Sequence, residues 1–127
     1  MPDFRTEAWR KLMLNATAAP MVTEGRRAEV FREPEHLATA KGLAEEAAAV
    51  ARAEGADIRA EHVEEVLATL TTMPPDLGTS MLFDRLAGRR LEWEARNGVV
   101  ARLGARHGIP TPVTDAVCAE LRALDTP

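Results

Sequence analysis

The chain has 127 residues, of which 46% are hydrophobic, 28% charged and 4% aromatic, with a formal net charge of −4. This length predicts one domain with its own core, and the hydrophobic content excludes a disordered chain. The charge and the scarcity of aromatic side chains argue against nucleic acid or an anionic membrane as the main partner. One cysteine, a polar N-terminus and no apolar run that could span a bilayer lead us to expect a cytoplasmic protein.

Helical periodicity predicts a first helix over residues 6–19, with an apolar face along one side. We expect Thr6 to cap this helix, because its hydroxyl can accept a hydrogen bond from a free N–H of the first turn, and Pro20 to stop or bend it. Lys11 and Asn15 are four residues apart, so they share a different face, flanked by small side chains. This polar pair fits either a solvated surface or a binding site with room in front of it.

The rest of the chain is also typical of helices and connectors. Residues 21–33 are less regular, and the helices expected after them cover residues 35–54, 57–73, 79–103 and 113–124. Gly88 and Gly98 are the positions where the helix over 79–103 is expected to bend or break. No segment alternates as a strand does, so we predict an all-α fold, a single domain of about five to seven helices over residues 1–127.

A second informative stretch covers residues 79–98. Ser80 and Asp84 share a helix face at a spacing of four residues. Glu92 follows Ser80 by twelve residues, which places it about 120° away on a straight helix. The two side chains face one site more easily if the helix bends or restarts near Gly88. A charged surface helix, with pairs such as Arg90 and Glu94, explains the same residues.

Motifs for other chemistries are not found. The sequence contains no Gly-x-Gly-x-x-Gly and no phosphate-binding lysine loop, so we expect no nucleotide site within this chain. The three histidines lack metalloprotease spacing, and the pair His62 and Glu65 lacks the second motif that a carboxylate-bridged metal centre needs. Cys118 is expected to be a small packed side chain. We therefore expect no metal.

Four motifs, in order and at suitable separations, give the chain a family resemblance. Together they resemble the C-terminal helical domain of ketopantoate reductase (2-dehydropantoate 2-reductase), a domain similar to the C-terminal domain of 6-phosphogluconate dehydrogenase, over nearly the whole chain. The motifs are Trp9-Arg10-Lys11-Leu12 followed by Asn15; Glu45-Glu46-Ala47-Ala48-Ala49-Val50-Ala51 followed by Gly55; Thr79-Ser80-Met81-Leu82-Phe83-Asp84 with Arg89-Arg90-Leu91-Glu92 and Asn97-Gly98; and His107-Gly108-Ile109-Pro110-Thr111-Pro112.

The resemblance implies an oxidoreductase that reduces a 2-keto acid, such as 2-dehydropantoate to pantoate in pantothenate biosynthesis. In that family an N-terminal Rossmann domain, which this chain does not contain, binds NADPH, and the helical domain closes over the substrate. The catalytic lysine and glutamate of the family fall on Lys11 and Glu92, and its substrate-binding asparagine and serine fall on Asn15 and Ser80. No cofactor-binding residue and no metal ligand is implied here.

One departure and one alternative remain. A second substrate-binding asparagine of the family is Ala19 here, so the substrate can be a 2-keto acid other than ketopantoate. The chain is either a domain excised from a longer reductase or a natural single domain. As an isolated chain it is expected to be inactive. The alternative function is a stand-alone, non-catalytic binding or dimerisation module.

The alanine-rich helix and uncovered apolar surface also lead us to expect a homodimer at high concentration.

Overall fold

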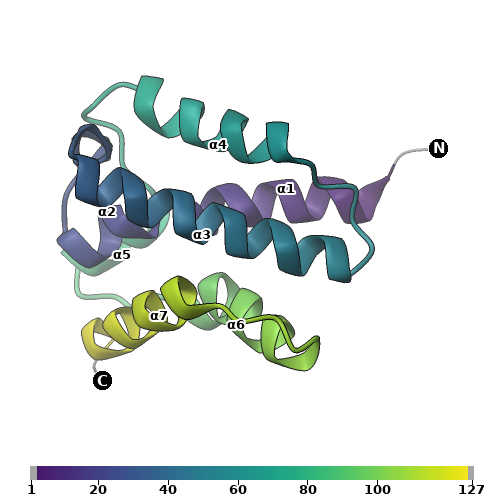
Figure 1. Ribbon diagram of the computed structural model, residues 1–127. Helices are drawn as coiled ribbons and strands as arrows, with labels where there is room; N and C mark the ends of the chain where they lie inside the picture. The colour runs from purple at the N-terminus through teal and green to yellow at the C-terminus, as the bar shows by residue number, and fades with distance from the viewer. Residues whose placement is uncertain (1–2, 126–127) are drawn as a thin grey trace.

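A computed structural model describes residues 3–125 of the chain, and within them it contains helices and no strands (Figure 1). The all-α prediction is therefore confirmed. The seven α-helices in this range are α1 (Phe4–Thr17), α2 (Ala19–Glu24), α3 (Pro34–Ala53), α4 (Ala60–Thr72), α5 (Ser80–Leu86), α6 (Asn97–Arg106) and α7 (Pro112–Leu124). Two short 3-10 helices in the same range are η1 (Ala28–Arg32) and η2 (Trp93–Ala95). Among residues 3–125, no helix is sufficiently long and apolar to cross a bilayer.

Helix α3 is the centre of the bundle. It contacts α1, α2, α4, α6, α7 and η1, and Figure 1 shows it between α4 on one side and the pair α6 and α7 on the other. Its buried face consists largely of alanines, which let neighbouring helices approach closely, as expected from the sequence. The buried residues of α3 are Ala40, Leu43, Ala44, Ala47, Ala48, Val50 and Ala51.

The start of α1 differs from the prediction. Asp3, not Thr6, caps the helix, because its Oδ1 accepts from the Thr6 backbone N–H at 3.1 Å. The Thr6 hydroxyl instead accepts from the Asp57 backbone N–H at 2.9 Å, which ties α1 to the connection between α3 and α4. The helix ends at Thr17, and Pro20 lies in the first turn of α2, where the fixed φ of proline suits the start of a helix.

The predicted helix over residues 79–103 is three separate elements. Thr79 caps α5, with its hydroxyl accepting from the Leu82 N–H at 3.2 Å, and the expected break follows at Gly88, whose φ is +73°. The chain then runs without helix to Glu92, and α6 begins only at Asn97. Ser80 and Glu92 therefore lie on different elements rather than on one bent helix.

Candidate functional site

Lys11 and Asn15 lie on one face of α1, as the spacing predicted. The lysine is exposed and the asparagine is half-buried. Within residues 3–125, Lys11 enters no ion pair, whereas its neighbour Arg10 pairs with Glu65 of α4 at 3.0 Å. An ammonium group without a protein counter-ion remains available for an anionic or carbonyl ligand.

Ser80 is the exposed first residue of α5, and Arg96, the residue just before α6, contacts it. The guanidinium Nη2 of Arg96 donates to the Ser80 hydroxyl oxygen at 3.2 Å. Arg96 lies between η2 and α6, sixteen residues further along the chain. Arg96 is absent from the residues predicted from the sequence, because nothing in its local sequence pattern indicates this contact.

Asn97 connects α6 to the end of α1, next to Asn15. It is fully buried, and its Nδ2 donates to the Ala16 carbonyl oxygen at 3.0 Å. In a continuous helix that carbonyl would accept the N–H of residue 20, but Pro20 has none. The Asn97 amide therefore replaces the missing donor. Its Oδ1 is buried and has no partner among the described residues.

Glu92 is held in a strained conformation between two buried residues, Leu91 and Trp93. Its φ is +55°, in the left-handed region that non-glycine residues seldom adopt and that is often found at functional sites. The carboxylate is exposed and, within residues 3–125, forms no ion pair with Lys11 or any other residue. The structure thus joins the ends of α1, α5 and α6, but it does not join Lys11 to Glu92.

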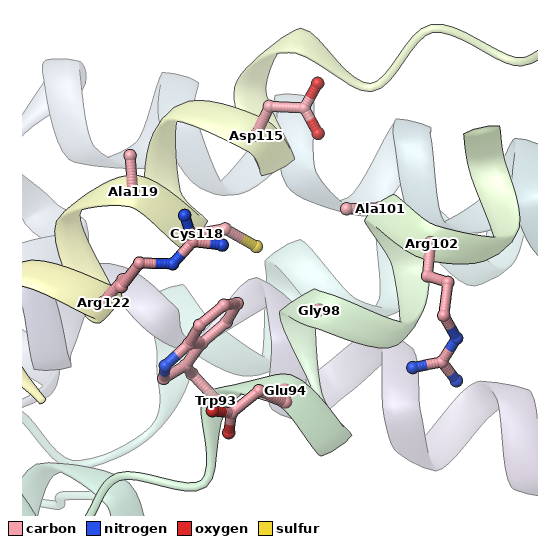
Figure 2. Close-up of a pocket in the computed structure, with 9 residues that line it drawn as sticks. All are labelled: Trp93, Glu94, Gly98, Ala101, Arg102, Asp115, Cys118, Ala119 and Arg122. Atoms are coloured by element: carbon pink, nitrogen blue, oxygen red, sulfur yellow. The ribbon is translucent and has the colours of Figure 1, made fainter.

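A groove of about 460 Å³ lies beside Trp93, between η2, α6 and α7 (Figure 2). Arg122 stacks over the Trp93 ring at 5.1 Å, and the Cys118 sulfur points into the groove between them and α6. Burial, with a smaller effect of Asp115, raises the pKa of the Cys118 thiol to about 11. The thiol stays protonated at neutral pH, so the groove has no activated nucleophile.

The histidine and glutamate considered as metal ligands have structural partners. His62 Nδ1 accepts from the Arg59 N–H at 2.8 Å, and Glu65 binds Arg10. Glu33, Glu35 and His36 also bring ligand atoms together at the surface, but Glu33 is occupied by an ion pair with Arg26. The described residues therefore give no reason to place a metal at either group.

The fold defines the chain as an all-helical domain of the kind present in solved ketopantoate reductases. It superimposes on a dimeric ketopantoate reductase from Staphylococcus aureus with a TM-score of 0.93 at 25% identity, covering 98% of this chain and 44% of that one. A PanE/ApbA family ketopantoate reductase from Ralstonia eutropha JMP134 gives a TM-score of 0.89 at 28% identity, covering 98% of this chain and 42% of that one.

The model of the family "Ketopantoate reductase PanE/ApbA C terminal" matches residues 3–125, so the chain belongs to this family. It is 48% identical over 122 residues to a 2-dehydropantoate 2-reductase of Mycobacterium tuberculosis, covering 96% of this chain and 41% of the relative. A 2-dehydropantoate 2-reductase of Caulobacter vibrioides is 40% identical, with 95% and 42% covered. The chain spans about two fifths of the length of these relatives.

Proposed function

We propose that this chain is the substrate-binding and catalytic domain of an NADPH-dependent reductase that converts a 2-keto acid, such as ketopantoate, to the 2-hydroxy acid. The observation that carries the proposal is the family match over residues 3–125, with Lys11, Asn15, Ser80 and Glu92 at the positions of the family motifs. NADPH supplies the hydride and is held by a nucleotide-binding domain, since this chain has no phosphate-binding motif.

In this mechanism Lys11 acts on the keto oxygen. Addition of a hydride to the carbonyl carbon leaves negative charge on that oxygen, which the Lys11 ammonium stabilises and protonates. Asn15 and Ser80 orient the substrate through hydrogen bonds. Glu92 acts as a partner that favours the charged lysine. Because the two side chains form no ion pair in the structure, this pairing requires the exposed side chains to turn toward each other when the substrate binds.

An apolar patch beside Ser80 supports the presence of a covering domain. On α5, Phe83 lies about 60° around the helix from Ser80, and Leu86 lies about 60° further round in the same direction. Both side chains are exposed, as is Leu77 just before the helix. Exposed apolar groups next to a polar site favour a second domain that closes over it and excludes water.

The test is steady-state kinetics on the two-domain reductase that contains this domain, with ketopantoate and a panel of 2-keto acids. We expect Lys11→Ala to lower kcat by roughly 10²–10⁴-fold, the usual contribution of a positioned acid. Glu92→Ala should have a smaller effect, and the double variant should fall far short of the product of the two effects, because the residues act as a unit.

Lys41→Ala is the matched control, since Lys41 is the only other lysine of the chain and lies exposed on α3. It should leave kcat unchanged. If Lys11→Ala retains activity within a few-fold of wild type on the best substrate, the catalytic assignment is wrong. The absence of a Lys11–Glu92 contact and the alanine at position 19 would then favour a non-catalytic binding or dimerisation module.

A further inference from the structure

Arg96 is a cation of the candidate site that no acidic side chain among the described residues neutralises. Its one recorded side-chain partner is the neutral hydroxyl of Ser80, at 3.2 Å. Within residues 3–125 it enters no ion pair, and it is only partly buried. A guanidinium has five N–H donors, so Arg96 keeps donors that can bind a ligand.

Two arginines of the preceding segment, Arg85 and Arg89, are bound in a different way. Arg85 donates to two backbone carbonyls at the end of α2, at 2.5 and 2.9 Å, and so closes that helix. Arg89 pairs with the carboxylate of Asp84 at 2.9 Å. These two side chains therefore stabilise the fold, whereas Arg96 forms neither an ion pair nor a side-chain bond to a backbone carbonyl among residues 3–125.

The stability of α6 does not explain Arg96 either. The residue immediately precedes the helix and forms no side-chain capping bond. A positive charge at the N-terminus of a helix opposes the helix dipole, so an arginine is a poor choice there unless an anion is nearby. Because the buried Asn97 is attached to α1 and Thr79 caps α5, both ends of the contact between Arg96 and Ser80 are held in place.

We propose that Arg96 binds the carboxylate of the 2-keto acid substrate together with Ser80, an inference that rests on the proposed function. The planar guanidinium matches the two oxygens of a carboxylate. Since the Ser80 oxygen accepts a hydrogen bond from Arg96, its own O–H can donate to the same carboxylate. Arg96 thus supplies donors that the site lacks at Ala19, and Lys11 remains available for the keto oxygen.

Arg96→Gln and Arg96→Lys in the two-domain reductase test this role, with Arg102→Gln as a control that removes the same charge from α6. We expect Arg96→Gln to raise the KM for the 2-keto acid by roughly 10- to 100-fold, the range for a lost hydrogen bond to a charged group. The kcat and the KM for NADPH should change less than about threefold, because the substrate and transition state carry the same carboxylate. Arg96→Lys should recover part of the loss, and Arg102→Gln should resemble wild type.

The outcomes separate this inference from the function on which it rests. A wild-type enzyme that oxidises no NADPH with any 2-keto acid contradicts both. An active wild type with an unchanged KM in Arg96→Gln contradicts the role of Arg96 alone. An equal loss in kcat and in both KM values, without recovery in Arg96→Lys, shows a structural residue and also overturns the inference.

Discussion

At the scale of single residues, Asn97 determines how α1 ends. Its Nδ2 donates to the Ala16 carbonyl oxygen, which cannot accept from Pro20 because proline has no N–H. We expect Asn97→Ala to lower the free energy of unfolding by about 1–3 kcal/mol, because the buried Ala16 carbonyl then loses its side-chain donor. Asn97→Asp has nearly the same shape but places an oxygen against that carbonyl and buries a charge, so its loss should be larger.

Urea unfolding of the 127-residue chain followed by circular dichroism measures both effects. The isosteric aspartate is the decisive variant, since it distinguishes a required donor from a side chain that only fills space. Equal stability of Asn97→Asp and wild type would contradict the assigned role.

The site residues differ in how far the sequence could reveal them. Lys11 and Asn15 share a face because of the period of one helix, a local property that the sequence shows directly. The contact of Arg96 with Ser80 spans 16 residues, and that of Asn97 with Ala16 spans 81. Such contacts depend on how helices pack, so spacing alone could not predict them. A proline four residues after Ala16 was the available signal that a carbonyl needed another donor.

At the scale of elements, the first turn of α7 is held by a carboxylate of α3. The two oxygens of Glu46 accept from the backbone N–H groups of Val113 and Thr114 at 3.0 and 2.7 Å. This arrangement satisfies two free donors of a helix N-terminus and places negative charge where the helix dipole favours it.

We therefore expect Glu46→Ala to destabilise the chain by about 1–2 kcal/mol, the usual contribution of a helix cap. Glu46→Gln keeps an acceptor and should cost less. Glu45→Ala, at the adjacent exposed position, is the control and should change stability by less than about 0.5 kcal/mol. Thermal unfolding of the variants measures the difference, and equal effects at positions 45 and 46 would show that the bond to α7 adds no stability.

Element boundaries were predicted best where the sequence has strong local signals. Pro34 and Gly55 bracket α3, and Pro112 starts α7, so both helices lie within a residue or two of their predicted ranges. The prediction over residues 79–103 was wrong in the middle, because apolar residues such as Leu91 and Trp93 fit a helical period although neither lies on an α-helix. They are buried by the turn of the chain at Glu92, which tertiary packing stabilises and local propensity disfavours.

At the scale of the whole molecule, the exposed apolar patch of α5 lies next to Ser80 of the candidate site and is also a surface through which two copies of the chain can associate. Leu86 is 59% exposed and Phe83 is 39% exposed, with Arg27 over the Phe83 ring at 5.3 Å. When no other domain covers this patch, a second copy of the chain can bury it by a two-fold contact in which each residue acts twice.

We expect the 127-residue chain to form a homodimer whose fraction rises with concentration in sedimentation equilibrium. Leu86→Ser should raise the dissociation constant at least tenfold, since burying a leucine contributes about 1.5–3 kcal/mol and the contact occurs twice. Phe4→Ser is the control, because Phe4 is 73% exposed at the start of α1, at the opposite end of the bundle from α5 (Figure 1). A chain that stays monomeric at millimolar concentration would contradict the prediction, and weaker association in Phe4→Ser alone would place the interface at the other end of the molecule.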